Sequence, residues 1–290
     1  MYLQKAERRR VKMKCLLAGP AGAGKTFSSL LLAIGLTGGR WESIAVIDSE
    51  NESSHLYAHL GPYNVVSIKA PFTPEKYSKA IAQCVEENME VIIIDSTTHM
   101  WTCLLEIHSM MPGNSFTNWN KITPRNDSFM QKMLQCPCHI IATTRTKQDY
   151  ILNEKNGKTV PEKVGLKAIQ RDGLEYEFTV VFDIDINHVA KSSKDRTGLF
   201  INSEPSVLSA ATGIALKNWC NSGIEFTPQE VLKRVEECKS VKDLIILYEF
   251  TPQFNEALKP EFEKRKHEII LARNTETNLS PVNILSNGTN

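Results

Sequence analysis

The sequence predicts an α/β fold, in which a doubly wound, mostly parallel β-sheet is followed by a small C-terminal helical appendage. Three observations support this prediction. Short apolar runs alternate with stretches of helical periodicity along most of the chain. The run Val91–Ile94 is continuous and β-branched, as is typical of strands buried on both faces of a parallel sheet. A glycine-rich turn at 19–24 joins the first apolar run to a helical pattern.

The composition is that of a globular protein with one large domain. The chain has 290 residues, of which 41% are hydrophobic and 23% charged. The net charge is only +1, so any affinity for nucleic acid must come from local basic patches. No run of about 18 apolar residues occurs, so we expect no membrane partner.

The cysteines and the start of the chain predict a cytoplasmic location. Residues 1–14 are basic and lack the apolar stretch of a secretory signal. The seven cysteines are odd in number and include no C-x-x-C pair. We therefore expect reduced, mostly buried thiols.

The apolar pattern and local end signals give the expected elements. Thr73 and Pro74 have the residue types preferred at the N-cap and first position of a helix. The expected strands are 11–18, 44–48, 65–68, 91–95, 139–143, 178–185 and 198–201. The expected helices are 27–36, 74–85 and 100–111.

The composition and periodicity of the sequence change after about Thr227. Three segments rich in Glu and Lys, at 228–238, 241–250 and 252–273, have the periodicity of short helices. From Asn274 onward the chain is mainly Asn, Thr, Ser and Pro, a composition typical of disorder. We expect a core domain at 1–226, a helical appendage at 227–273 and a disordered tail at 274–290.

The strongest functional motif is Gly19-x-x-x-x-Gly24-Lys25-Thr26 at the junction of a strand and a helix. This is the P-loop pattern, in which backbone N–H groups and a helix N-terminus surround phosphate oxygens. Lys25 would reach the β- and γ-phosphates of ATP, and the Thr26 hydroxyl would bind Mg²⁺. The expected nucleotide contacts in this segment are Gly19, Pro20, Ala21, Gly22, Ala23, Gly24, Lys25, Thr26 and Phe27.

Three polar strand ends complete the predicted nucleotide site. Asp95 ends a buried strand, where a carboxylate holds Mg²⁺ together with Thr26. Glu50 follows another strand and is the candidate for activating the attacking water, with Asp48 a weaker one. Alternatively, Glu50 caps a loop or pairs with a lysine. Thr144 is the candidate sensor of the γ-phosphate, or else an ordinary hydroxyl at a strand end.

Two segments are expected to bind single-stranded DNA. Segment 145–175 is basic, is longer than most connections and contains the hairpin signal Asn156-Gly157. Loop 112–125 adds aromatic residues, although Trp119 could equally fill the core. Basic side chains with aromatic rings suit single strands, while the alternative is a solvated hairpin. The expected DNA-binding residues are Trp119, Lys121, Arg145, Lys147, Tyr150, Lys155, Lys158, Lys163, Lys167 and Arg171.

A short basic segment, 191–197, is expected to form a tight turn late in the sheet. Its Lys194 and Arg196 could act on the nucleotide of a neighbouring subunit, as arginine fingers do. The alternative is a polar β-turn without a catalytic role.

Together these motifs resemble the RecA-like recombinase ATPases, and above all the phage-encoded, core-only members described as AAA-family phage nucleotide-binding proteins. Some of those proteins are regarded as single-strand annealing proteins. RecA itself has Asn-Gln where this chain has Thr143-Thr144. The matching segments are Gly19–Thr26, Ile47–Glu50, Ile94–Trp101, Thr144–Tyr150, Val164–Lys167, Gln170–Phe178 and Lys194–Gly198.

The resemblance implies a RecA-like P-loop NTPase fold and an ATP-dependent, single-stranded-DNA-binding recombination protein. It implies ATP and Mg²⁺ binding by Lys25, Thr26 and Asp95, and water activation by Glu50. The segments 112–125 and 146–175 would take the places of the two DNA-binding loops. Lys194 and Arg196 would act on ATP bound to the adjacent subunit of a filament or ring. A single-strand-binding protein is a further candidate partner, and a phage-encoded chain would work in the cytoplasm of its bacterial host.

Two other functions remain open at this point. The protein could be an ATP-binding switch or helicase-loading partner with little turnover. It could also be a P-loop kinase for a small molecule, although the long basic segment and Glu50 argue against that class.

Overall fold

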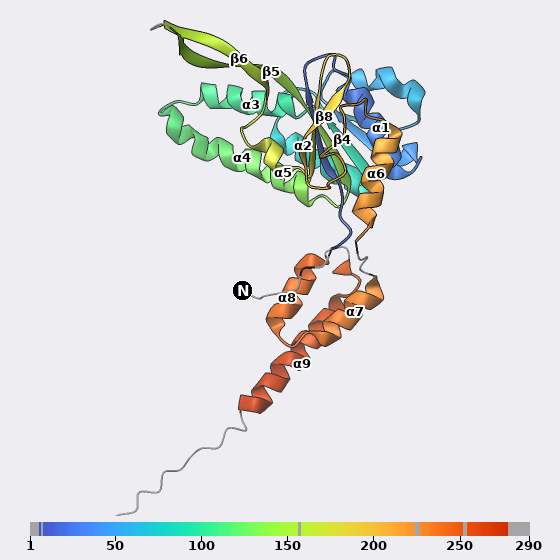
Figure 1. Ribbon diagram of the computed structural model, residues 1–290. Coiled ribbons are helices and arrows are strands. Elements are labelled where there is room, and N and C mark those ends of the chain that lie inside the picture. The colour runs from blue at the N-terminus through green and yellow to red at the C-terminus, as the bar shows by residue number, and fades with distance from the viewer. Residues whose placement is uncertain (1–5, 7, 156–157, 224–226, 252–253, 278–290) are drawn as a thin grey trace, which may run out of the picture. The chain divides into compact units, whose positions relative to one another are not determined.

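The chain divides into two compact units, Met1–Gly223 and Ile224–Asn290, in the computed structural model. The structure describes residues 6, 8–155, 158–223, 227–251 and 254–277. Within these ranges, the side chains of 148–155, 158–166, 249–250 and 273–277 are not described. The first unit contains the predicted α/β sheet, with helices on both faces (Figure 1).

Eight strands form the sheet in the described part of the first unit, in the order β3-β2-β4-β5-β1-β7-β8, with β6 pairing only with β5. Strands β1 to β5 and β7 run parallel, whereas β8 and β6 are antiparallel to β7 and β5. The strands are β1 (Lys14–Gly19), β2 (Ile44–Asp48), β3 (Asn64–Ser67), β4 (Val91–Asp95), β5 (His139–Lys155), β6 (Lys158–Ala168), β7 (Val180–Ile184) and β8 (Ala190–Asp195).

The position of β5 determines which side chains meet at the carboxyl edge of the sheet. Strand β5 pairs with β1 on one side and with β4 on the other, so Thr144 lies opposite Ala18 and Ala142 lies opposite Ile94. Beyond Arg145, β5 leaves the sheet and pairs with β6 as a two-stranded ribbon (Figure 1). The predicted strand 139–143 is therefore the first part of a much longer one.

Helices cover both faces of the sheet and bury a separate apolar core on each. Helices α1 and α6 pack together with one core, which includes Leu17, Val46 and Ile93. Helices α2, α3 and α4 contribute to the other core, which includes Leu16 and Ile94. The helices of this unit are α1 (Lys25–Thr37), α2 (Pro74–Glu86), α3 (Thr97–Met110), α4 (Ser115–Gln135), α5 (Leu174–Glu177) and α6 (Ala210–Asn221), with 3₁₀ segments η1 (Trp41–Ser43) and η2 (Ser53–Leu60).

Three local predictions in this unit were wrong. Most of the expected loop 112–125 belongs to helix α4, which Asn114 caps by accepting a hydrogen bond from the backbone N–H of Phe116. Most of the expected turn 191–197 belongs to β8, which gains a hydrogen-bonded partner in β7. The expected strand 198–201 is a turn, in which the carboxylate of Asp195 accepts bonds from the backbone N–H groups of Thr197 and Phe200.

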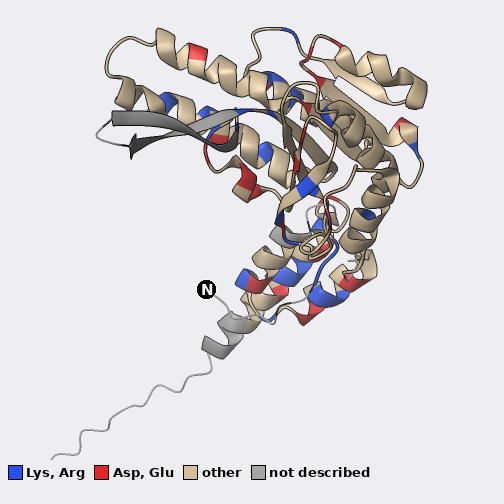
Figure 2. Cartoon of the chain, turned by 45° about the horizontal axis from the view of Figure 1, so that its top comes forward, with Lys and Arg blue, Asp and Glu red and all other residues tan. Residues whose placement is uncertain are grey.

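The second unit is helical around a small apolar core. It contains α7 (Pro228–Glu237), α8 (Val241–Phe250) and α9 (Lys259–Thr277), which bury Val231, Leu244 and Phe262. Helix α7 begins with a capping box between Thr227 and Glu230. Figure 2 shows basic and acidic residues interspersed along these helices. Helix α9 runs to Thr277, so the first residues of the predicted tail are helical, while 278–290 lie outside the described residues.

The cysteine prediction is confirmed, because all seven cysteines are free and buried. Among the residues that the structure describes, no helix combines the length and apolar character needed to cross a membrane.

Helices α1 and α6 touch backbone to backbone at two glycines. A Cβ added at Gly35 would lie 2.2 Å from the carbonyl oxygen of Ala210 and 2.7 Å from the Cα of Gly213. A Cβ at Gly213 would lie 2.3 Å from the carbonyl oxygen of Leu32. These distances are far below van der Waals contact, so only glycine fits at either position without a shift of the helices.

We therefore predict that Gly35→Ala lowers the free energy of unfolding by about 1–3 kcal/mol, as overpacked cores do. Helix propensity alone would give the opposite sign, because alanine stabilises an open helix by about 1 kcal/mol relative to glycine. The control is Asn218→Ala at an exposed position of α6, which we expect to be neutral or slightly stabilising. Urea denaturation of the three proteins tests this, and a Gly35→Ala variant more stable than the parent would contradict it.

Candidate nucleotide site

The predicted P-loop connects β1 to α1 at the carboxyl edge of the sheet. Gly22 and Gly24 both have φ of 80°, in the left-handed region that favours glycine. Gly24 is also the N-cap residue of α1, so the loop leads directly into the helix N-terminus. This arrangement aims the first N–H groups of α1 toward the loop, where an anion is stabilised.

Lys25 is held inside the loop by two carbonyl oxygens. Its Nζ donates to the oxygens of Gly19 at 3.0 Å and Pro20 at 2.8 Å. The side chain is almost fully buried, and this burial lowers the pKa of its ammonium group, which the charges of Asp95 and Glu50 partly oppose. A buried cation of this kind is stabilised by anionic oxygens close to it.

Asp95 ends β4 and links two other elements through hydroxyl groups. The Thr26 Oγ1 donates to its Oδ2 at 2.5 Å, and the Thr143 Oγ1 donates to its Oδ1 at 2.6 Å. Burial raises the pKa of Asp95, while both hydrogen bonds act in the opposite direction. The P-loop helix, the predicted metal-binding strand and β5 therefore meet at one carboxylate.

The oxygen atoms of Thr26 and Asp95 fit the ligand preferences of Mg²⁺. The described residues contain no group of three or more His, Cys, Asp and Glu side chains able to hold a metal ion. Mg²⁺ in nucleotide sites is held by one or two protein oxygens together with phosphate and water, and Thr26 and Asp95 can supply two such oxygens.

Glu50 lies just beyond β2, on a turn that Asp48 holds in place. Asp48 accepts hydrogen bonds from the backbone N–H groups of Glu50 at 2.7 Å and Ser54 at 2.8 Å, so its role is to position this turn. The carboxylate of Glu50 accepts from Ser96 Oγ at 2.9 Å. It also pairs with Arg145, whose Nε lies 3.0 Å from Oε1 and whose Nη2 donates to Oε2.

Arg145 is therefore part of the nucleotide pocket, although its sequence context had placed it among the DNA-binding residues. This ion pair is close to the alternative role of Glu50, pairing with a lysine, except that the partner is an arginine. The guanidinium is 38% exposed and the carboxylate 17%, so the pair is only partly screened by water.

A cavity of about 550 Å³ contains these groups. The rings of Phe27 and Tyr57 lie 5.9 Å apart at an angle of 55° on its wall. Asn187 and His188, from the connection between β7 and β8, add further polar atoms. The lining comprises Ala21, Gly22, Gly24, Lys25, Thr26, Phe27, Ser28, Glu50, Ser53, Tyr57, Asp95, Arg145, Asn187, His188 and Val207.

Thr144 is not among the residues that line this cavity. It is fully buried, and its hydroxyl lies 3.2 Å from the hydroxyl of Thr98 on α3. Its neighbour Thr143 makes the contact with Asp95 instead. The sequence analysis did not identify Thr143, Ser96 and Tyr57 as site residues. For Thr143 alone a signal existed, because side chains alternate along a strand and Thr143 and Thr144 must therefore face opposite sides of the sheet.

The two predicted DNA-binding residues on α4 differ in their exposure to solvent. Trp119 lies on α4 and is partly buried, with its ring 4.2 Å from that of His108 and 6.1 Å from that of Trp101. It fills the core side of the helix, while Lys121 on the same helix is exposed.

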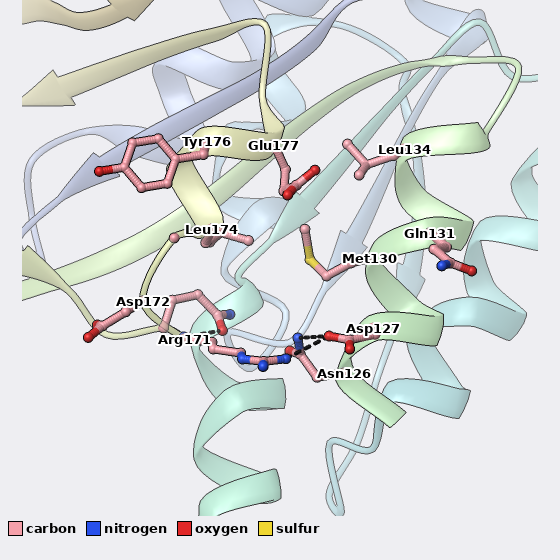
Figure 3. Close-up of a pocket in the computed structure, with 12 residues that line it drawn as sticks. Asn126, Asp127, Met130, Gln131, Leu134, Arg171, Asp172, Leu174, Tyr176 and Glu177 are labelled. Carbon is pink, nitrogen blue, oxygen red and sulfur yellow. Dashed lines mark hydrogen bonds and ion pairs between the residues drawn. The ribbon is translucent and has the colours of Figure 1, made fainter. Parts of the chain in front are cut away.

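The remaining predicted basic residues lie along and just after the ribbon. Lys147 is exposed, and Lys167 forms an ion pair with Asp172 at 2.9 Å. The guanidinium of Arg171 lies 2.6 Å from the carboxylate of Asp127, across a second cavity of about 560 Å³ between α4 and α5 (Figure 3). The side chains of Tyr150, Lys155, Lys158 and Lys163 lie outside the described residues.

Lys194 and Arg196 lie at the opposite edge of the sheet from the P-loop. Strand β8 is antiparallel to β7, and Lys194 lies opposite Val181, near the amino end of β7. The Lys194 Nζ donates to the carbonyl oxygens of Glu175, at 3.0 Å, and Tyr176, and Arg196 donates to the latter at 3.0 Å. Neither residue lines the cavity of its own chain.

A comparison with protein families agrees with this geometry, whereas a search of curated proteins finds no match. The sequence model of the AAA domain matches residues 11–211, which is more than half of the chain and includes the P-loop, Glu50, Asp95 and the ribbon. This chain therefore belongs to the AAA-domain family of nucleotide-binding P-loop ATPases.

Proposed function

We propose that this protein is a DNA-stimulated ATPase that binds single-stranded DNA and promotes annealing or strand exchange as a homo-oligomer. The observation that carries the proposal is the position of the β5–β6 ribbon. Arg145 lines the nucleotide cavity, and the next residue, Thr146, is the first that pairs within the ribbon. A ligand on the ribbon is thus connected through one strand to the nucleotide site.

The nucleotide chemistry follows from the buried polar groups. Lys25 binds the phosphates of ATP, and Thr26 and Asp95 hold Mg²⁺, which neutralises developing charge on the phosphates when bound. Glu50 accepts the proton of the water whose oxygen attacks the γ-phosphorus, as the bond to the bridging oxygen breaks and ADP leaves. The aromatic pair of Phe27 and Tyr57 offers an apolar surface for the base.

The ribbon has the composition expected of a surface that binds a polyanion. Ten residues of β5 lie beyond the sheet, and at about 3.3 Å per residue they extend about 33 Å. The strands carry Lys147, Lys155, Lys158, Lys163 and Lys167, and Tyr150 adds a ring for base stacking. Backbone phosphates would supply most of the affinity, with stacking contributing about 1–3 kcal/mol per base.

The position of Lys194 and Arg196 favours a role between subunits. Lys194 lies near the end of β8 and Arg196 just after it, and neither residue lines the cavity of its own chain. In an oligomer they would reach ATP bound to the neighbouring subunit and stabilise transition-state charge. To do so, both side chains would have to break their hydrogen bonds to the carbonyl oxygens of α5.

A second candidate function is an ATP-binding switch with little turnover, such as a helicase-loading partner. One observation favours it, namely that both oxygens of the Glu50 carboxylate are already hydrogen-bonded. A general base needs a lone pair open to water. If this pairing persists in the ATP complex, hydrolysis would be slow.

We predict that Glu50→Gln lowers ATP turnover by about 10²–10⁴-fold, the range for a lost general base, while ATP affinity is retained. The control is Glu52→Gln, an exposed position on the same turn, which we expect to leave turnover unchanged. Phosphate release and equilibrium binding of a fluorescent ATP analogue measure the two quantities. A wild-type protein without turnover, with or without single-stranded DNA, would favour the switch.

We predict that replacing Lys155, Lys158 and Lys163 together by alanine weakens binding to single-stranded DNA and flattens its salt dependence. Each phosphate contact contributes about 0.7 to the slope of log affinity against log salt, so the slope should fall by about 2. The control replaces the exposed Lys259, Lys264 and Lys266 of α9, which removes the same charge. Fluorescence anisotropy at several salt concentrations measures the slopes. Equal slopes for the wild type and the ribbon variant would contradict the assignment of the ribbon as the DNA-binding element.

We predict that the Lys25→Ala variant and the Lys194→Ala/Arg196→Ala double variant are each inactive, and that mixing them restores part of the ATPase activity. Lys25→Ala subunits still supply Lys194 and Arg196, while subunits with Lys194→Ala and Arg196→Ala still supply an intact P-loop. Mixing Lys25→Ala with a variant that carries all three changes is the control, in which no complete site can form. No recovery at any ratio would argue against sites shared between subunits.

A further inference from the structure

His188 lies in the short connection between β7 and β8, and its side chain reaches the P-loop. A Cβ added at Gly24 would lie 2.9 Å from His188 Nδ1 and 3.6 Å from two carbons of the same ring. The imidazole therefore occupies the space that a side chain at position 24 would fill, next to the N-cap of α1. His188 also lines the nucleotide cavity, although it belongs to no motif of the sequence.

The backbone of this connection is held by Asp185. Its Oδ1 accepts hydrogen bonds from the N–H groups of Asn187 and Val189, both at 2.9 Å. Its backbone N–H donates to the carbonyl oxygen of Val189 at 3.0 Å, and its carbonyl oxygen accepts from the N–H of His188 at 3.1 Å. These bonds keep His188 at a φ of 67°, in the left-handed region that few residues other than glycine adopt. Residues held in this region cluster at binding and active sites.

His188 approaches the P-loop from the side opposite to the groups assigned to hydrolysis. Strand β7 borders β1 on one side, whereas β5, β4 and β2 follow on the other. Glu50, Asp95 and Arg145 all come from the ends of those three strands. The part of the nucleotide nearest to His188 is therefore the phosphate bound at the N-terminus of α1, where helix N–H groups stabilise an anion. An imidazole N–H is a donor that suits a phosphate oxygen.

We propose that His188 is a further phosphate-binding residue, which donates a hydrogen bond to the diphosphate group that ATP and ADP share. The inference rests on the nucleotide chemistry of the proposed function and does not involve its DNA-binding part. Because the ring lies on the β7 side of the loop, it contacts the nucleotide equally before and during the attack on the γ-phosphorus. Such uniform binding lowers KM and leaves kcat unchanged.

The test uses two substitutions that both accept the backbone conformation of His188. Glycine adopts a positive φ freely, and asparagine does so more readily than most residues. Of the two, only asparagine offers a side-chain nitrogen donor. A comparison of His188→Gly with His188→Asn therefore separates the hydrogen bond from the shape of the connection. Asn88→Gly is the matched control, because Asn88 has a φ of 58°, is exposed and does not line the cavity.

Isothermal titration calorimetry measures the affinities for ADP and for a non-hydrolysable ATP analogue. For His188→Gly we expect both affinities to fall by the same factor, about tenfold, which is the effect of losing one hydrogen bond to a charged group. His188→Asn should recover most of this loss, and Asn88→Gly should match the wild type. In steady-state assays of His188→Gly, the KM for ATP should rise by about the same factor at unchanged kcat.

Inorganic pyrophosphate identifies the part of the nucleotide that the ring contacts, because it has neither base nor ribose. Its affinity is measured by competition with a fluorescent ADP analogue in the wild type and in His188→Gly. We expect the affinity for pyrophosphate to fall by about the same factor as the affinity for ADP.

Four results would overturn the inference. Unchanged affinity for both nucleotides in His188→Gly would mean that the ring binds no part of them. Weaker ADP binding with unchanged pyrophosphate binding would place the ring at the base or the ribose. Equal losses in His188→Gly and His188→Asn would mean that the hydrogen bond is not the cause, and a lower kcat would mean that the ring acts on the γ-phosphate.

Failure of the proposed function is seen separately, in the wild type. If the wild type binds ADP but does not hydrolyse ATP, the ATPase proposal fails, while the affinities for ADP and pyrophosphate still test His188. If the wild type does not bind single-stranded DNA, the DNA-binding proposal fails and the affinities for nucleotides are unaffected.

Discussion

The pairing of β5 with both β1 and β4 is the constraint on which the nucleotide site depends. Parallel strands place their carboxyl ends at one edge, and the order of the strands decides which of those ends are neighbours. With β5 between the P-loop strand and the strand of Asp95, Thr143 bonds Asp95 and Arg145 lies opposite Gly19. A different strand order would keep every motif and separate these groups.

The buried polar groups of the site stabilise one another through hydrogen bonds. Burial raises the pKa of Asp95 and lowers that of Lys25, so it disfavours the charged form of both groups. The hydroxyls of Thr26 and Thr143 and the carbonyl oxygens of the P-loop offset part of this cost. The site is therefore built to become more favourable when phosphate and cation charges enter it together.

Much of the fold could be predicted from local sequence signals. Strands β2 and β4 have the predicted bounds, because uninterrupted apolar runs leave little ambiguity in a parallel sheet. Helix α4 was missed, since it contains Pro124 and several asparagines, which normally disfavour a helix interior. Its apolar face against α2 and α3 outweighs these local preferences.

The parts of the site that sequence reasoning missed depend on three-dimensional partners. The P-loop could be recognised from the fixed spacing of its residues, and Asp95 from its position at the end of an apolar strand. The pairing of Glu50 with Arg145 joins positions 95 residues apart, and no local pattern specifies it. Whether Thr143 or Thr144 faces Asp95 depends on the register of β5 against β4, which the sequence does not reveal.

The contact of Gly35 with Gly213 gives the fold a mechanical property. Two helices that meet at their backbones leave no room for a side chain between them, so any larger residue at this contact must displace α6 relative to α1. Helix α1 begins at Lys25, and α6 is the last helix before the chain passes into the second unit. A substitution that displaces α6 at this contact would therefore act on the helix that holds the phosphate-binding loop.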